Sequence, residues 1–140
     1  MKVAFERRER VRFGHCDPAG IVYYPRYFEM LHGVMEDWFN EGLKVNYAEF
    51  LGQRRFGMPT IQLHSDFRRI SRMGDVLRQQ LIVTKLGRTS LGLRTEFHGD
   101  DGVRAAFDQV LVCTSLDTHQ PTPFPDDLRA ALELCINDES

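Results

Sequence analysis

The sequence has few cysteines and no long apolar run. Cys16, Cys113 and Cys135 are odd in number and widely spaced, which fits neither a disulfide framework nor a zinc-ligand pattern. No stretch approaches the roughly 18 apolar residues of a membrane-spanning helix. The opening segment MKVAFERRERVRF lacks the continuous apolar core of a secretory signal. These absences favour a reduced, cytoplasmic protein with no membrane partner.

Lysine is also scarce. Fifteen of the 18 basic residues are arginine, and the net charge of the whole chain is -2. Residues 1–116 carry a small excess of basic side chains, which is too little for a nucleic-acid-binding surface. Guanidinium groups match planar phosphate and carboxylate groups better than ammonium groups do. The composition therefore excludes a nucleic-acid partner and leaves small anions, polar strand faces and subunit contacts as uses for arginine.

The length of 140 residues fits one domain, residues 1–140, with a core large enough to need no disulfide. Alternation over residues 3–13, with Val3, Phe5, Val11 and Phe13 on one face, predicts a strand that buries this face in the core. A loop dense in turn formers follows at residues 14–20. The period then becomes helical from Pro25 to Glu41, and Gly42 occupies the position of a left-handed cap.

After a short helical turn at residues 46–54, the chain is strand-like until residue 116. One long helix followed by a strand meander predicts an α+β fold with an antiparallel sheet curled around the helix. A doubly wound fold is disfavoured because helices and strands do not alternate. The expected later elements are the strands Thr60–Ile70, Asp75–Leu86, Ser90–His98 and Val103–Ser115, and a short helix from Asp126 to Cys135.

The loop before the long helix, GHCDPAG, carries the strongest candidate for catalysis. Asp17 lies in it, flanked by glycines, just ahead of a helix start whose free N–H groups near Tyr23 and Tyr24 could hold an oxyanion. A carboxylate and an oxyanion site are two components of acyl-transfer chemistry. The alternative is that Asp17 only forms the turn. A thiol–imidazole pair from Cys16 and His15 is disfavoured, because adjacent extended residues point in opposite directions.

The motif from Phe13 to Tyr27, FGHCDPAGIVYYPRY, resembles that of the 4-hydroxybenzoyl-CoA thioesterase family of hotdog-fold acyl-CoA thioesterases. A second similar segment, DFRR, begins at Asp66. The resemblance implies the hotdog fold, in which an antiparallel sheet wraps around one long central helix. It also implies that Asp17 attacks the thioester or activates water, and that the backbone N–H of Tyr24 polarises the thioester carbonyl.

The resemblance further implies where the substrate lies. Arg88 and Ser90, in the turn after the second of the four strands, are expected to bind the phosphates of CoA. His32 occupies the position where the 4-hydroxybenzoyl enzyme has an aspartate that binds the phenol, so His32 and Tyr27 are expected to contact the acyl group. A histidine there suits a hydroxyl, a carboxylate or an amino group, and the tyrosines favour an aromatic acyl group. We expect no metal and no cofactor besides the CoA of the substrate.

The expected function is hydrolysis of an aromatic, benzoyl- or hydroxybenzoyl-type acyl-CoA to the free acid and CoA. One alternative is a short-chain aliphatic acyl-CoA thioesterase of the Tol–Pal-associated branch, although those proteins commonly have histidine at the position of Tyr24. A non-catalytic acyl-CoA-binding protein is the other alternative. Exposed strand edges and the resemblance together predict a homotetramer, a dimer of dimers with active sites at subunit interfaces.

Overall fold

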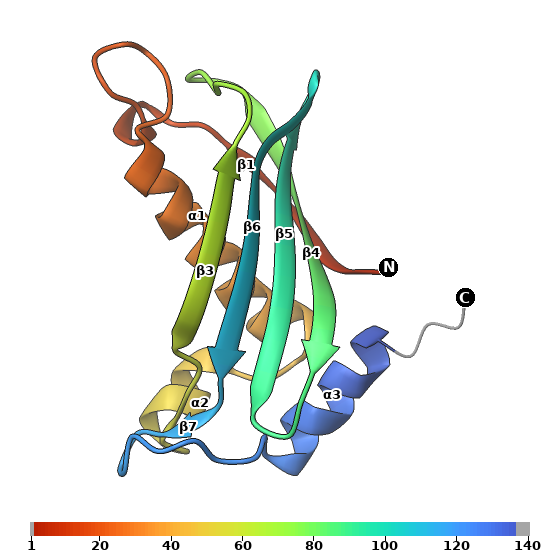
Figure 1. The fold of residues 1–140 in the computed structure, drawn as a ribbon. Coiled ribbons are helices and arrows are strands. Elements are labelled where there is room, and N and C mark those ends of the chain that lie inside the picture. The colour runs from red at the N-terminus through yellow and green to blue at the C-terminus, as the bar shows by residue number, and fades with distance from the viewer. Residues whose placement is uncertain (1, 137–140) are drawn as a thin grey trace.

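The computed structural model describes residues 2–136, which form an antiparallel five-stranded sheet, a long helix and several shorter elements (Figure 1). The strand order in the sheet is β1-β4-β5-β6-β3. The strands of this sheet are β1 (Val3–Arg10), β3 (Thr60–Phe67), β4 (Val76–Leu86), β5 (Ser90–Gly99) and β6 (Gly102–Val112). The helices are α1 (Tyr24–Asp37), α2 (Tyr47–Gly52) and α3 (Asp126–Ile136).

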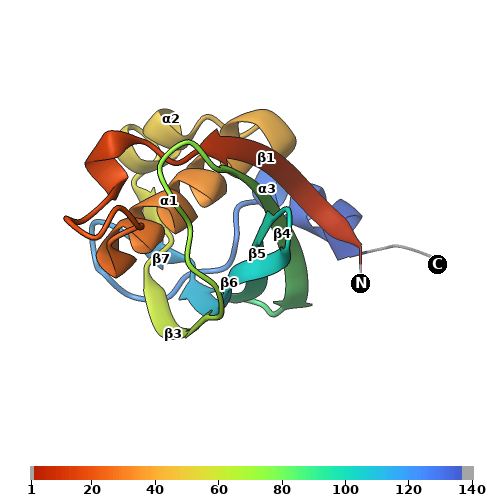
Figure 2. The same cartoon turned by 90° about the horizontal axis from the view of Figure 1, so that it is seen from above.

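The sheet curves around α1 from β1 through β4, β5 and β6 to β3 (Figure 2). Apolar side chains of α1 pack against those of the central strands, and Val34, Trp38 and Phe39 are completely buried. Helix α3 adds Leu128 and Leu132 to the same core. The predicted α+β architecture, one long helix wrapped by an antiparallel sheet, is therefore confirmed.

The first strand is shorter than predicted, because β1 ends at Arg10 and a 3-10 turn, η1 (Phe13–His15), follows. The prediction that Phe13 faces the core is wrong, since its side chain is 83% exposed. Arg7 and Glu9, which interrupt the apolar alternation, are only partly exposed on the side of the strand that faces α1. These two residues therefore form a polar cluster on the face of β1 that would otherwise be apolar.

The end of the long helix also differs from the prediction. Helix α1 ends at Asp37 and continues as a π-helical turn, η2 (Trp38–Gly42), in which the N–H of Leu43 donates to the carbonyl of Trp38 at 2.7 Å. The left-handed residue after it is Lys44, with φ 60°, and not Gly42. Gly42 is required for another reason, because a Cβ there would lie 2.8 Å from the indole of Trp38.

The remaining boundaries lie close to the predicted ones. The strand predicted to end at Ser115 is divided: β6 ends at Val112, and β7 (Thr114–Ser115) pairs separately with β2 (Phe56–Gly57). A hairpin joins β5 to β6, with Gly99 opposite Gly102 and Gly102 in the left-handed region at φ 113°.

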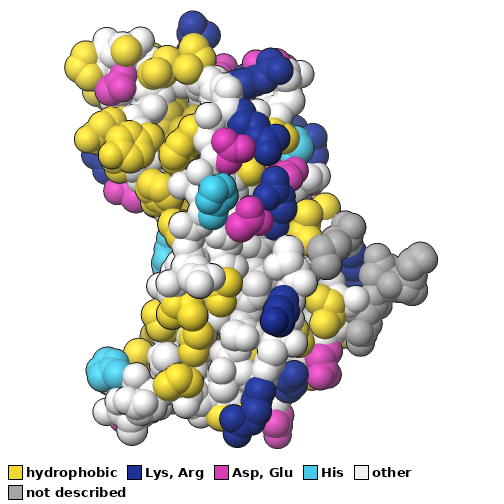
Figure 3. All heavy atoms as spheres, viewed as in Figure 1, with side chains coloured by type: hydrophobic (Ala, Val, Ile, Leu, Met, Phe, Trp, Pro, Cys, Tyr) yellow, Lys and Arg dark blue, Asp and Glu magenta, His cyan; other side chains and the backbone are white. Residues whose placement is uncertain are grey.

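Strand β3 is an edge of the sheet, and its apolar side chains are uncovered. Ile61 is 59% exposed, Leu63 43% and Phe67 44%. Figure 3 shows hydrophobic side chains gathered along this side of the molecule, from the start of α1 down the edge that β3 forms in Figure 1. An apolar edge strand with unpaired backbone groups is a surface that can pair with another strand.

Candidate active site

The loop before α1 folds as a small hairpin. The N–H of Tyr23 donates to the carbonyl of His15 at 2.9 Å, and the N–H of Asp17 donates to the carbonyl of Ile21 at 3.0 Å. Gly20 closes the turn with φ 81°, a conformation that glycine adopts without strain. The hairpin places Asp17 near its tip and returns the chain directly to the first residue of α1.

The carboxylate of Asp17 is half-buried, and one of its oxygens, Oδ1, accepts the N–H of Ala19 at 2.9 Å. This bond is the one that the turn-forming interpretation of Asp17 predicts. It also fixes the orientation of the carboxylate relative to the hairpin. The two interpretations are therefore compatible, because a carboxylate that stabilises the turn keeps its second oxygen available for another role.

The start of α1 leaves backbone N–H groups free, as helix starts do. Tyr23 is the N-cap residue, without a side-chain cap, and Pro25 follows Tyr24 in the first turn. Among residues 2–136, the N–H of Tyr24 has no acceptor. The Tyr24 ring is 59% exposed. A free N–H at the positive end of a helix is suited to stabilise a developing oxyanion.

Tyr27 lies one turn further along α1 and is largely buried, with 5% of its surface exposed. Its hydroxyl donates to Oγ of Ser71 at 3.0 Å, and Arg104 donates to the same oxygen at 3.2 Å. Burial raises the pKa of the Tyr27 phenol, so it stays protonated at neutral pH. The hydroxyl is therefore engaged inside the protein, while the ring borders a pocket of about 220 Å³ that Tyr24 also lines.

His32 is exposed on α1 and lines a larger pocket of about 510 Å³. Its ring contacts that of Tyr47 edge-on, with the centroids 6.1 Å apart, and its Nδ1 lies 3.9 Å from Oε1 of Glu36. His32 lies eight residues after Tyr24, about 12 Å along the helix axis. The walls are mostly apolar, and a second imidazole, that of His119, belongs to the lining. The pocket extends from α1 to the edge formed by β3.

Arg88 and Ser90 lie at the other end of the sheet. They belong to the turn between β4 and β5, and the Asp17 hairpin follows β1, whose last residue pairs with the first residue of β4 (Figure 1). The eleven residues of β4 separate the two ends by about 30 Å. Arg88 is exposed, and Ser90 borders a hollow of about 530 Å³ that Lys85 also lines. Within one subunit, Arg88 and Ser90 are therefore too far from Asp17 to belong to the same site.

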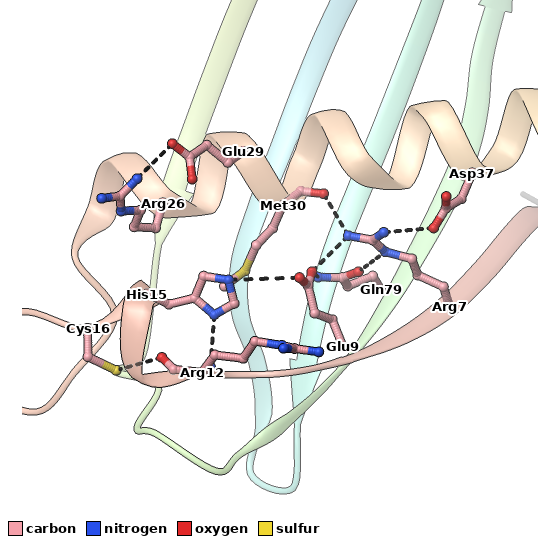
Figure 4. Close-up of polar contacts among 10 residues, drawn as sticks. All are labelled: Arg7, Glu9, Arg12, His15, Cys16, Arg26, Glu29, Met30, Asp37 and Gln79. Atoms are coloured by element: carbon pink, nitrogen blue, oxygen red, sulfur yellow. Dashed lines mark hydrogen bonds and ion pairs between the residues drawn. The ribbon is translucent and has the colours of Figure 1, made fainter. Parts of the chain in front are cut away.

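A polar cluster beneath the hairpin escaped the sequence-based site prediction (Figure 4). Arg7 donates to Gln79 at 2.6 Å, to Asp37 at 2.8 Å and to Glu9 at 2.7 Å. Gln79 is completely buried and lies opposite Arg7 in the sheet. The only sign of this cluster in the sequence is that two charged residues interrupt the apolar face of β1. The sequence does not identify their partners, which lie on β4 and α1.

Comparison with known proteins agrees with this geometry. Residues 11–132 match the sequence profile of the thioesterase-like superfamily. The fold and this match define a hotdog-fold thioester hydrolase. The chain belongs to the thioesterase-like superfamily, as the resemblance of its loop motif predicts.

Three similar proteins have related names. The 1,4-dihydroxy-2-naphthoyl-CoA hydrolase of Synechococcus elongatus is 26% identical over 125 residues, which cover 89% of this chain and 91% of that protein. The 4-hydroxybenzoyl-CoA thioesterase of a Pseudomonas species is 29% identical over 84 residues, 59% of this chain and 60% of that protein. A crystal structure from the thioesterase superfamily of Jannaschia sp. has a TM-score of 0.86 and 27% identity, covering 95% of this chain and 93% of that one.

Two negative findings apply to residues 2–136. No group of three or more histidine, cysteine, aspartate or glutamate side chains is placed to hold a metal ion there. None of the helices described in this part of the chain has the length and apolarity needed to cross a membrane.

Proposed function

We propose that this protein hydrolyses aromatic acyl-CoA thioesters, with Asp17 as the reacting carboxylate and the N–H of Tyr24 as the oxyanion donor. The observations that support the proposal are the hydrogen-bonded hairpin that holds Asp17 and the free N–H of Tyr24 at the start of α1, to which this hairpin leads. A thiolate is a good leaving group, so the reaction needs no strong general acid. One carboxylate and one oxyanion site are sufficient for this chemistry.

Two routes use the same two groups. In the nucleophilic route, a carboxylate oxygen of Asp17 adds to the thioester carbon, CoA leaves as the thiolate, and water then hydrolyses the mixed anhydride. In the general-base route, Asp17 takes a proton from a water molecule as that water adds to the carbon. The N–H of Tyr24 stabilises the tetrahedral oxyanion in both routes, and both end with the free acid and CoA.

The pocket next to His32 is the proposed site of the acyl group. Its volume of about 510 Å³ and mostly apolar walls suit a flat ring, and ligand pockets commonly fall in the range of about 300–1,000 Å³. Two of the similar proteins have names that specify aromatic acyl groups, 1,4-dihydroxy-2-naphthoyl and 4-hydroxybenzoyl. His32 is placed to hydrogen-bond a polar substituent on such a ring, and the ring of Tyr27 adds apolar surface near Tyr24.

The position of Arg88 and Ser90 supports an oligomeric active site. If β3 pairs antiparallel with β3 of a second copy, the two sheets run in opposite directions, and the far end of one subunit lies alongside the Asp17 end of the other. CoA bound at Asp17 could then place its phosphates near Arg88 and Ser90 of a neighbouring subunit. We therefore propose a homotetramer, a dimer of dimers with its active sites at subunit interfaces. The free thiols of all three cysteines favour a cytoplasmic location.

Release of free thiol from a panel of CoA esters tests the proposed function. The panel contains benzoyl, 4-hydroxybenzoyl, 1,4-dihydroxy-2-naphthoyl and short aliphatic esters, and we expect the aromatic esters to have the highest kcat/KM. Asp17→Asn should lower kcat by about 100-fold or more on the best ester. Asp100→Asn, which changes an exposed aspartate in the turn between β5 and β6, is the matched control and should retain wild-type turnover.

Three outcomes would contradict the proposal in different ways. A preference for aliphatic esters would favour the Tol–Pal-associated type of activity. Binding of CoA in calorimetry without thiol release from any ester would favour a binding protein. Near-normal turnover by Asp17→Asn would remove Asp17 from the mechanism. A covalent acyl group on Asp17, trapped by rapid quenching and detected by mass spectrometry, would distinguish the nucleophilic route from the general-base route.

A further inference from the structure

We propose that Glu9 and His15 form a positioning pair that holds the Asp17 hairpin and the start of α1 in their reactive arrangement. Neither side chain needs to touch the substrate. The proposal rests on the function proposed above, because the arrangement it describes is that of Asp17 and the Tyr24 N–H. The two residues connect a partly buried ion-pair cluster to the backbone of the hairpin (Figure 4).

Glu9 is held in place from two directions. Its Oε1 accepts a hydrogen bond from Arg7 at 2.7 Å and another from the buried amide of Gln79 at 3.1 Å. Arg7 is itself fixed, because it also donates to Asp37 at 2.8 Å and to the carbonyl of Met30 at 3.1 Å. A carboxylate with two such partners has one orientation, and its second oxygen, Oε2, lies 3.9 Å from Nε2 of His15.

The imidazole of His15 has a defined tautomer in this arrangement. Its Nδ1 accepts the backbone N–H of Arg12 at 2.8 Å, which requires a lone pair on Nδ1. The proton of the neutral ring is therefore on Nε2, on the side of Glu9. At 3.9 Å the contact is longer than a hydrogen bond, and the negative charge of Glu9 favours the tautomer with the N–H on Nε2. Glu9 thus keeps His15 in the form that binds Arg12.

The backbone of His15 transmits this arrangement to the reacting groups. Its carbonyl accepts the N–H of Tyr23, the N-cap residue of α1, at 2.9 Å. Tyr23 immediately precedes the residue that supplies the oxyanion N–H, and Asp17 is two residues after His15. A shift of the His15 ring therefore moves both ends of the hairpin. A misplacement of about 1 Å can lower turnover about 100-fold without weakening substrate binding.

Kinetics of matched variants test the pair. We expect Glu9→Ala and His15→Ala each to lower kcat by about 10- to 100-fold, with KM within about twofold of the wild type. Glu9→Gln keeps an oxygen acceptor and should recover most of the lost kcat. The double variant Glu9→Ala/His15→Ala should be no slower than the worse single variant, because both changes break one connection. Glu6→Ala, on the exposed side of the same strand, is the control and should keep the wild-type kcat.

A rise in KM with unchanged kcat, multiplicative losses in the double variant, or a Glu9→Gln enzyme as slow as Glu9→Ala would overturn the proposal. Nitrogen-15 NMR of the imidazole of wild-type His15 gives a test that needs neither activity nor a folded variant. We expect the proton on Nε2, and a proton on Nδ1 would overturn the pair. If the wild type hydrolyses no CoA ester, the proposed function fails, while the NMR measurement still decides the arrangement of Glu9 and His15.

Discussion

The guanidinium of Arg7 packs against the bare backbone of Gly33 on α1. A Cβ at Gly33 would lie 2.9 Å from Nη2 and 3.1 Å from Nη1 of Arg7. The missing side chain lets Arg7, on β1, reach the carbonyl of Met30 and the carboxylate of Asp37 across the helix surface. A glycine in the middle of a helix is unfavourable by itself, by roughly 1 kcal/mol relative to alanine. Here it makes room for the ion-pair cluster beneath the Asp17 hairpin.

Gly33→Ala should therefore destabilise the protein even though alanine is the better helix former. The new methyl group would displace a guanidinium that is fixed by four hydrogen bonds. Losing one or two bonds to a charged group outweighs the gain in helix propensity, and we expect a net loss of about 1–2 kcal/mol in urea unfolding. In an Arg7→Met background the same change should be neutral or stabilising. A stabilising Gly33→Ala in the wild-type background would show that Arg7 moves aside at little cost.

The buried hydroxyl of Tyr27 gives a second prediction about stability. It donates to Oγ of Ser71, which also accepts from Arg104. Tyr27→Phe should lower the free energy of unfolding by about 1 kcal/mol, the usual net value of one intramolecular hydrogen bond. Tyr47→Phe is the matched control, because Tyr47 is also partly buried and its hydroxyl has no hydrogen-bond partner among residues 2–136. Equal losses in the two variants would mean that the Ser71 bond contributes nothing measurable.

Much of this arrangement is visible in the sequence because it is local. The hairpin motif and the helix that follows Pro25 are set by turn residues and by helical periodicity, and both were predictable from neighbouring residues. The π-helical turn was not, because it depends on how Trp38 packs against the sheet. The role of Arg7 depends on Gln79, which is distant in sequence and opposite it in the sheet. Periodicity marks such a residue as an exception to the pattern but does not identify its partner.

The carboxylate of Asp75 predicts a dependence of stability on pH. Its pKa is lowered, first by the backbone N–H of Arg72 and then by hydrogen bonding to Arg104. A carboxyl group with a depressed pKa in the folded state contributes stability above its unfolded pKa, about 3.9 for aspartate, and loses it as the pH falls through the folded value. The free energy of unfolding of Asp75→Asn should therefore fall less steeply than that of the wild type as the pH drops below about 4.

Chemical unfolding at a series of pH values measures this slope. Arg104→Met should also flatten it, since one of the groups that lowers the pKa of Asp75 is removed. The double variant should be flatter than Asp75→Asn alone, because Arg104 also lowers the pKa of Asp101. An Asp75→Asn protein with the full wild-type acid slope would assign the acid sensitivity to the other carboxylates that have lowered pKa values, Glu96, Asp101 and Asp127.

The proposed acyl pocket makes His32 a determinant of specificity. His32→Ala should raise KM for hydroxylated aromatic esters by about tenfold, the value of about one hydrogen bond, and leave KM for benzoyl-CoA within about twofold. His32→Asn, which restores a polar group on the helix, should recover part of the difference. Steady-state kinetics on benzoyl- and 4-hydroxybenzoyl-CoA provide the comparison. Equal effects on both esters would place the polar substituent elsewhere in the pocket.

The exposed edge of β3 makes the oligomeric state testable with one substitution. Ile61 is 59% exposed there, and a lysine in its place would put a charge on the apolar edge. If β3 pairs with β3 of a second copy, Ile61→Lys should give an assembly smaller than that of the wild type in size-exclusion chromatography with light scattering. It should also lose turnover, because Arg88 and Ser90 of the neighbour are removed. Leu134→Lys is the matched control and should keep the wild-type mass. Leu134 is 70% exposed on α3, and this helix packs against β1 and β4, away from β3. An Ile61→Lys protein with the wild-type mass would exclude β3 as the interface, and a fully active monomer would show that one chain supplies the whole site.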